Sequence, residues 1–155
     1  MKLYIVRHAE AEERASGARD FDRVLTGRGI RQASALARHV KDLSGKSPEV
    51  ICSSPAPRAL QTATIIAAAI EIPVTIDPRL DLETDATQVR SLVRSLASDG
   101  VKRAMVVGHN PTLEDFAAAI GAGSGLKKAE MIAADVECDA RTVVAKRFDR
   151  FKPHD

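Results

Sequence analysis

The chain has 155 residues, of which 45% are hydrophobic and 28% charged, and its formal net charge is +2 at pH 7. This composition is typical of a folded globular protein, whereas a near-neutral charge and 3% aromatic residues argue against a nucleic-acid surface. The longest apolar run, residues 65–70, is too short to cross a membrane, and the start of the chain does not resemble a signal peptide. We therefore predict a cytoplasmic protein, and the length favours a single domain over residues 1–155.

The first elements expected are a strand and a helix joined by a long loop. A short apolar run at residues 3–6 predicts a buried strand, and the polar stretch at residues 9–24 predicts a loop. Apolar residues then recur at helical spacing over residues 26–43, beginning with Ile30, and Gly45 is a plausible stop signal.

The middle of the chain repeats this alternation. A second strand is expected at residues 50–52, followed by an alanine-rich helix over residues 55–70. Pro55 and Pro57 both fall in the predicted first turn, where a missing N–H costs little. A short strand at residues 74–76 comes next.

Two further helices follow in the second half. Asp85 and Gln88 have the spacing of a capping box, which predicts a helix start there, and Gly100 marks its end. A buried strand is expected at residues 104–107. Asn110 is then the expected N-cap of a helix that begins with Pro111 and extends to about residue 120.

The tail carries two β-like runs, at residues 131–136 and 142–148, which predict a hairpin at one edge of a sheet. Strands that alternate with helices indicate an α/β protein. We therefore expect a three-layer α/β/α sandwich with a central, mostly parallel sheet.

Charged and polar side chains follow three of the predicted strands. Arg7 and His8 follow the first strand, Arg58 comes shortly after the second, and His109 follows the strand at residues 104–107. In open α/β sheets, ligands bind in the crevice at the carboxyl ends of the strands. The sequence thus predicts one site that holds two arginines and two histidines.

Arg58 indicates which ligand this site would take. It falls in the first turn of its predicted helix, where the helix dipole disfavours a cation. An anion there would be favoured both by the free N–H groups and by the guanidinium. Together with Arg7, this position favours a phosphate ligand over a surface salt bridge.

Four segments resemble the motifs of the histidine phosphatase superfamily. They are, in chain order, Arg7-His8-Ala9-Glu10, Leu25-Thr26-Gly27-Arg28-Gly29-Ile30-Arg31-Gln32-Ala33, Ser53-Ser54-Pro55 through Arg58-Ala59 to Gln61-Thr62-Ala63, and Val106-Val107-Gly108-His109-Asn110-Pro111. Within the superfamily, the short chain resembles the SixA-type phosphohistidine phosphatases. One departure is Ala9, which stands where the family has glycine and is tolerable if residue 9 does not need a positive φ.

The resemblance implies a phosphoglycerate mutase-like fold and a phosphatase that needs neither cofactor nor metal. It implies that His8 attacks phosphorus as a neutral imidazole and is transiently phosphorylated. Arg7 and Arg58 would bind the phosphoryl oxygens, with a protonated His109 as a third donor and Asn110 nearby. The Gly-rich stretch Gly121–Gly125 follows a helix rather than a strand and is expected to be a loop that could border the cleft.

The substrate remains open between two classes. The leading prediction is phosphohistidine on a signalling or carrier protein, and the alternative is a small phosphorylated metabolite. An alcohol leaving group needs an acid, for which Asp81 and Glu83 are both candidates. Imidazole leaves readily because the pKa of its conjugate acid is near neutral, so the lack of a single clear acid favours phosphohistidine. A third hypothesis, from another class, is a non-catalytic phosphate-binding adaptor.

Overall fold

The fold is built on a six-stranded sheet, seen in a computed structural model that describes residues 1–154. The strand order is β3-β2-β4-β1-β5-β6. The strands are β1 (Lys2–Arg7), β2 (Val50–Ser53), β3 (Val74–Ile76), β4 (Arg103–Gly108), β5 (Met131–Cys138) and β6 (Val143–Phe151). The first four are parallel, whereas β5 and β6 form an antiparallel hairpin at one edge. The mostly parallel sheet and its edge hairpin are confirmed.

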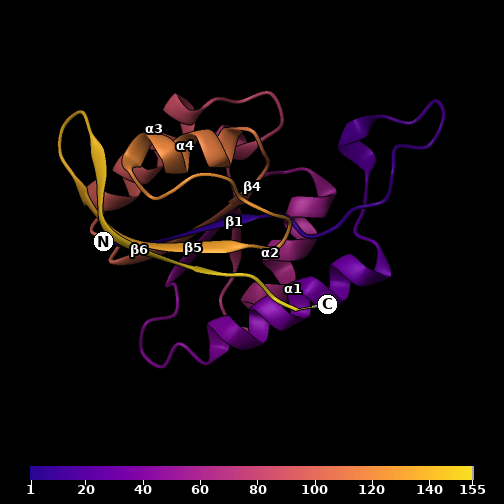
Figure 1. Ribbon diagram of the computed structural model, residues 1–155, viewed down its shortest axis with the longest axis horizontal. Coiled ribbons are helices and arrows are strands. Elements are labelled where there is room, and N and C mark those ends of the chain that lie inside the picture. Colours follow the sequence, from indigo (N-terminus) through magenta and orange to yellow (C-terminus); the bar gives the residue numbers. More distant parts are fainter. Residues whose placement is uncertain (155) are drawn as a thin grey trace.

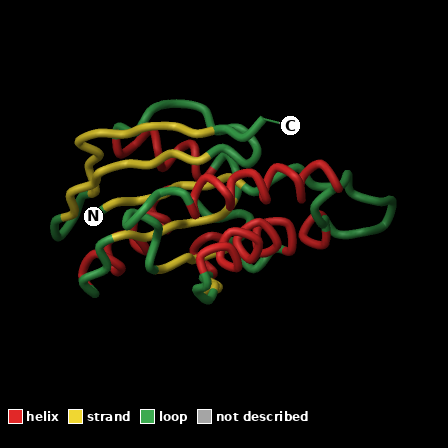
Figure 2. Tube along the Cα trace, turned by 90° about the horizontal axis from the view of Figure 1, so that it is seen from below, coloured by secondary structure: helices red, strands yellow, loops and turns green. Residues whose placement is uncertain are grey.

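Helices cover both faces of this sheet. They are α1 (Gly27–Lys41), α2 (Pro57–Ile70), α3 (Ala86–Ser98) and α4 (Thr112–Ile120), with the short 3-10 helices η1 (Asp20–Asp22) and η2 (Pro78–Leu80). Figure 1 shows α3 and α4 on one side of the strands and α1 and α2 on the other, and Figure 2 shows the strands side by side. The three-layer α/β/α arrangement is therefore confirmed.

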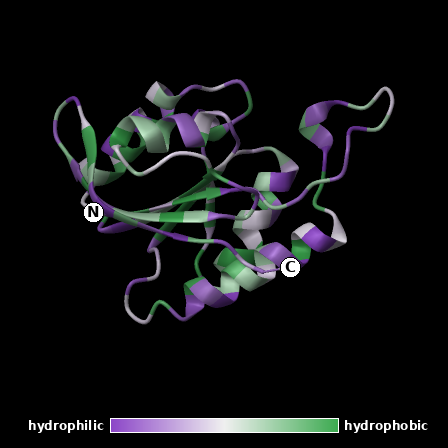
Figure 3. Cartoon of the chain, viewed as in Figure 1, coloured by the Kyte–Doolittle hydropathy of each residue, from purple (hydrophilic) through white to green (hydrophobic). Residues whose placement is uncertain are grey.

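The strands divide the apolar core into two halves. Because successive side chains of a strand point to opposite faces, Leu3 and Ile5 pack into the cluster beneath α3 and α4. Tyr4 and Val6 pack into the second cluster, against α1 and α2. Figure 3 shows this apolar character along the central strands. The core on both faces thus fixes the position of β1, and the candidate residues Arg7 and His8 lie at its carboxyl end.

The start of α1 packs against the segment that follows β1. Thr26 caps the helix, and its side chain accepts the Gly29 N–H at 3.0 Å. A Cβ atom on Gly29 would lie only 2.0 Å from the Glu10 carbonyl oxygen, so no larger residue fits there. The glycine thus lets α1 approach Glu10, whose carbonyl accepts the Thr26 N–H at 3.1 Å.

Several predicted boundaries need correction. Pro55 lies before the N-cap Ala56, so only Pro57 is inside the first turn of α2. The N-cap of α4 is Pro111 rather than Asn110, because the Asn110 side chain bonds elsewhere and does not cap the helix. Ile30 belongs to the apolar spacing that predicts α1, yet its side chain is 46% exposed. Within the described residues, no helix is long and apolar enough to cross a membrane.

Candidate active site

The carboxyl ends of β1 and β4 bring two histidines together. Arg7 is paired with Gly108 in the sheet, and the His8 N–H donates to the Gly108 carbonyl at 3.0 Å. His109 directly follows the last residue of β4. The centroid of its ring lies 5.2 Å from that of the His8 ring, and the two ring planes are tilted by 58°. Both rings are nearly buried. Two imidazoles thus line the same end of the sheet.

The hydrogen bonds of His8 define which ring nitrogen is free. Nδ1 lies 2.7 Å from the carbonyl oxygen of Ala9, an acceptor only, so Nδ1 carries the proton. The lone pair is therefore on Nε2. A neutral imidazole with one bound N–H and one free nitrogen is the form required of a nucleophile.

Residues from two helices fix the peptide that orients His8. Thr62, in α2, accepts the Ala9 N–H at 3.1 Å and donates to the Arg58 carbonyl at 2.8 Å. Gln32, in α1, accepts the Glu10 N–H at 3.0 Å. Ala9 is fully buried and is not among the residues with positive φ, so alanine is accommodated at this position.

Arg58 lies in the first turn of α2, and its guanidinium is bound to a carboxylate of the long loop. Nη1 donates to the Asp20 carbonyl at 2.8 Å, and Nη2 lies 3.1 Å from the Asp20 carboxylate. The Arg58 side chain is only 4% exposed, whereas that of Asp20 is 47% exposed. A hydrogen bond from Arg23, reinforced by Arg58, lowers the pKa of Asp20. The buried guanidinium already binds an oxyanion here.

His109 is oriented by a serine at the end of β2. Its Nε2 lies 2.8 Å from the Ser54 hydroxyl, which is fully buried and accepts the Ala56 N–H at 3.1 Å. Among the described hydrogen bonds, His109 Nε2 is the one partner that can accept the proton of this buried hydroxyl, so we assign the proton to that bond. This assignment makes Nε2 the acceptor and leaves the proton on Nδ1.

Arg7 and Asn110 share one acceptor. Arg7 Nη1 donates to the Leu126 carbonyl at 3.2 Å, and Asn110 Nδ2 donates to the same oxygen at 2.7 Å. Asn110 Nδ2 also donates to the Glu114 carboxylate at 3.1 Å. Both amide hydrogens of Asn110 are thus used within the protein, which suits an orienting role better than direct contact with phosphate.

Unpartnered N–H groups make this end of the sheet a candidate anion site. Among the described residues, Arg7 Nε, Arg58 Nε and His109 Nδ1 are buried nitrogens without a hydrogen-bond partner. Leaving a buried donor unpaired costs about 1–3 kcal/mol, so such groups need a reason. An oxyanion that accepted from all three would satisfy them together.

Burial sets the charge of the two histidines. It lowers the pKa of His8 to about 3, with His109, Arg58 and Arg7 adding to the shift. Burial and the charge of Arg58 lower the pKa of His109 to about 4. The ring of His109 is thus neutral in the protein without phosphate and donates through Nδ1, and its protonation with phosphate bound stays a prediction.

These depressed values predict a loss of stability on acidification. In the unfolded chain both histidines titrate near their ordinary pKa of about 6.5, so below that pH the unfolded state binds more protons. The free energy of unfolding should therefore fall by about 2 kcal/mol per histidine between about pH 7 and about pH 5. Urea unfolding at both pH values measures this loss. His8→Asn should show about half of it, and equal stabilities at the two pH values would contradict the assignment.

The two carboxylates considered as acids lie on the segment beside His109. A Cβ atom on Gly108 would lie 3.3 Å from the Leu80 carbonyl, so the chain leading to Asp81 passes close to the end of β4. Asp81 accepts the Leu82 N–H at 2.7 Å, whereas Glu83 is exposed with a φ of 63°. Either residue as a general acid stays a prediction. Within residues 1–154, no group of three or more His, Cys, Asp or Glu side chains is placed to bind a metal ion.

The contributors to this geometry that were not assigned from the sequence include Asp20, Ser54, Thr62 and Leu126. Ser54 and Thr62 lie inside a recognised motif, so their positions relative to Arg58 were the available signal. Asp20 lies in the short 3-10 helix η1, inside a stretch that the sequence predicts to be a loop, and Leu126 acts through its backbone carbonyl. The sequence gives no signal for either.

Comparison with known proteins relates this geometry to a family. The family model described as histidine phosphatase superfamily (branch 1) matches residues 3–92. An uncharacterised protein from Picosynechococcus is 37% identical over 142 residues, which cover 85% of this chain and 83% of that protein. A candidate phosphohistidine phosphatase SixA from Agrobacterium tumefaciens has a similar structure, with a TM-score of 0.79, 29% identity and coverage of 95% of this chain and 96% of that one. A mycobacterial glucosyl-3-phosphoglycerate phosphatase shares the fold, with a TM-score of 0.77, 20% identity and coverage of 99% of both chains.

Proposed function

The chain belongs to the histidine phosphatase superfamily, and we propose that it removes phosphate from phosphohistidine on a signalling or carrier protein, with His8 as the nucleophile. Membership makes the protein a phosphatase. The observation that supports His8 is its neutral ring, held by Ala9 at Nδ1, beside three unpartnered N–H groups. We also propose that residues 1–155 form one domain, because one sheet contains strands from both ends of the chain.

In the proposed first step, Nε2 of His8 attacks phosphorus. A bond forms between phosphorus and Nε2 while the bond from phosphorus to the substrate imidazole breaks. That imidazole keeps the electron pair and leaves as a neutral ring whose other nitrogen already carries a proton. The phosphorylated His8 ring is a cation, and its Nδ1–H still donates a hydrogen bond to the Ala9 carbonyl. Water then attacks phosphorus in line with Nε2, and the bond from phosphorus to Nε2 breaks with its electron pair returning to Nε2. Phosphate leaves with the protons of the water, and His8 is neutral again.

The other groups stabilise the charge that spreads over the equatorial oxygens. Arg7 and Arg58 supply two guanidinium groups, and His109 donates through Nδ1. The scheme uses no metal ion, because the arginines provide the positive charge. For the phosphate to bind Arg58 fully, the Asp20 carboxylate must yield its place on Nη2. Asp20 is half exposed, so the loop that carries it can move without opening the core.

A groove beside α2 supports a protein as the substrate. It has a volume of about 510 Å³ and is lined largely by apolar side chains. Ile30 and Val24, both well exposed, line it together with Pro55 and Pro57. Pro57, one of the lining residues, directly precedes Arg58 in α2. An apolar surface of this kind suits a protein partner better than a small, highly charged metabolite.

One observation favours a phosphomonoesterase as the second candidate. The Thr112 hydroxyl donates to the Thr84 carbonyl at 2.7 Å, which ties the segment holding Asp81 and Glu83 to the start of α4. A carboxyl group on that segment could protonate an alcohol leaving group.

The cytoplasmic location stays a prediction from the sequence.

The substrate test compares a phosphohistidine-bearing carrier protein with a panel of small phosphomonoesters. Ile30→Glu places a charge in the groove and should lower kcat/KM for the protein by about tenfold while leaving the best monoester unchanged. Val144→Glu is the matched control, since Val144 is 43% exposed on β6, near the end of the sheet remote from His8. It should change neither activity.

The outcomes separate the three hypotheses. Fast loss of phosphohistidine with weak monoester turnover supports the proposal. Strong turnover of one monoester would assign a metabolite phosphatase instead. Binding of inorganic phosphate without turnover of any substrate would leave a phosphate-binding adaptor.

A further inference from the structure

We propose that Arg150, in the last strand, is a positioning residue that holds Arg7 through the loop between α4 and β5. This inference rests on the proposed function, because it assigns Arg150 a role only if Arg7 binds phosphate. Arg150 lies outside every motif that relates the chain to its family. The argument starts from the contacts of its guanidinium.

Arg150 binds a carboxylate and two backbone carbonyls at once. Nε and Nη2 donate to the two oxygens of Glu130 at 3.1 and 3.0 Å, which is a bidentate pair. Nη1 donates to the Ser124 carbonyl at 2.8 Å, and Nη2 also donates to the Gly125 carbonyl. The Arg150 side chain is 31% exposed and that of Glu130 only 11%, so water competes little at the carboxylate.

Glu130 also binds the backbone of the same loop. Its carboxylate accepts the Lys127 N–H at 2.8 Å in addition to the two bonds from Arg150. Residues 124–130 are thus held at both ends by one ion pair. A bidentate guanidinium is required for this, because an ammonium group cannot form the same set of planar bonds.

The segment held in this way carries the acceptor for Arg7. Leu126, between the two attachment points, accepts from Arg7 Nη1 at 3.2 Å and from Asn110 Nδ2 at 2.7 Å. Ala129 donates its N–H to the carbonyls of Arg7 and His8, at 3.0 and 3.2 Å. The loop therefore touches both the backbone and the guanidinium at the end of β1.

The sequence of the loop explains why its conformation depends on hydrogen bonds from outside the loop. Gly121, Gly123 and Gly125 all have positive φ, and glycine loses more conformational entropy on ordering than any other residue. A Cβ atom on Gly123 would lie 3.1 Å from the Phe148 ring and 3.3 Å from Arg150, so the loop lies directly against β6. Without Arg150, the Leu126 carbonyl would lose its fixed position, and with it the orientation of Arg7.

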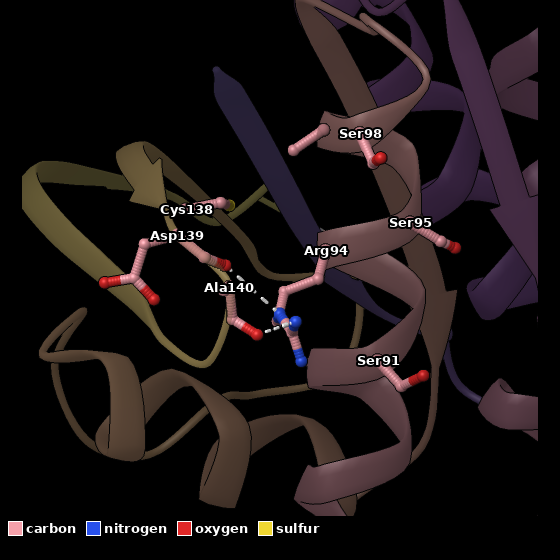
Figure 4. A pocket seen from close by; sticks show the side chains of 8 residues that line it. Ser91, Arg94, Ser95, Ser98, Cys138, Asp139 and Ala140 are labelled. Carbon is pink, nitrogen blue, oxygen red and sulfur yellow. Dashed lines mark hydrogen bonds between the residues drawn. The ribbon is translucent and has the colours of Figure 1, made fainter.

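A second arginine provides a matched control at the other end of the molecule. Arg94, in α3, also donates to two backbone carbonyls of a turn, those of Asp139 and Ala140 (Figure 4). That turn follows the end of β5, and β5 runs antiparallel to β1, so it lies beyond the end of β1 opposite to His8. Arg94→Met removes similar hydrogen bonds to a turn, in a part of the molecule that holds none of the proposed catalytic groups.

The test is a double-mutant cycle with the best substrate of the wild-type enzyme. Arg150→Met should lower kcat/KM by about tenfold, since small misplacements caused far from the reacting atoms reduce rates by up to about 10²-fold. Arg7→Met should lower it further. If Arg150 acts through Arg7, then adding Arg150→Met to Arg7→Met should cause no further loss. Arg94→Met should leave kcat/KM unchanged.

Additive losses in the double variant, or an Arg150→Met enzyme as active as Arg94→Met, would overturn the inference. Inactivity of the wild type, or full activity of Arg7→Met, would instead contradict the proposed function. A readout independent of turnover is the ¹⁵N resonance of the Arg7 guanidinium, identified by its absence in Arg7→Met. It should shift in Arg150→Met and stay in place in Arg94→Met. If Arg150→Met is poorly folded, Arg150→Lys keeps the charge and should show an intermediate loss.

Discussion

Replacing His8 with asparagine is expected to lower kcat by at least about 10⁴-fold, because the reaction loses its nucleophile. The asparagine amide is not nucleophilic, but its N–H can still donate to the Ala9 carbonyl in place of Nδ1. The variant should therefore fold and keep Arg7, Arg58 and His109 in position. Inorganic phosphate should bind it with an affinity within a few-fold of the wild type, since the guanidinium groups are unchanged.

Trapping of the covalent intermediate gives a direct measurement. Wild-type enzyme quenched during turnover of a ³²P-labelled substrate should carry label that is stable in alkali and lost in acid, as expected of a phosphorus–nitrogen bond. His8→Asn should carry none. Label retained at His109 would show that the two rings have the opposite roles. The hydrogen bonds argue against that exchange, since Nε2 of His109 is bound to Ser54 and Nε2 of His8 is free.

The parts of the fold that follow from local patterns could be predicted from the sequence. Buried parallel strands read as continuous apolar runs, and the Asp85 capping box marked the start of α3 because both of its hydrogen bonds are local. Arg7, His8 and His109 were predicted to lie together because ligands of open α/β sheets bind at the carboxyl ends of the strands. Local chemistry and topology were sufficient for these features.

The rest depends on contacts between segments far apart in the chain. Asparagine is favoured at the N-cap position, yet the Asn110 side-chain amide donates to the carbonyl of Leu126, 16 residues away. Asp20 contacts Arg58 across 38 residues, from a loop without periodicity. Ile30 fits the apolar period of α1 but lines a surface groove, because periodicity does not say what covers a helix face. No single-residue pattern encodes these pairings.

Replacing Arg58 with lysine is expected to lower kcat/KM by about 10³-fold, mostly through kcat. Lysine keeps the positive charge, so a large loss would show that the geometry of the guanidinium matters. Arg58 already contacts Asp20 through two nitrogens, and Nε remains unpartnered. A single ammonium cannot follow the charge that spreads over several phosphoryl oxygens in the transition state, where binding is worth more than in the ground state.

Arg19→Lys provides the matched control for this prediction. Arg19 also binds a carboxylate with two nitrogens, at 3.0 and 2.9 Å from Asp22, but its side chain is 75% exposed. Exposed pairs contribute little, so this variant should match the wild type in stability and in kcat/KM. An Arg58→Lys enzyme with near wild-type kcat would contradict the role of Arg58 in the transition state. A rise confined to KM would instead assign Arg58 to binding that is equally strong in the ground state and the transition state, because only interactions that strengthen in the transition state raise kcat.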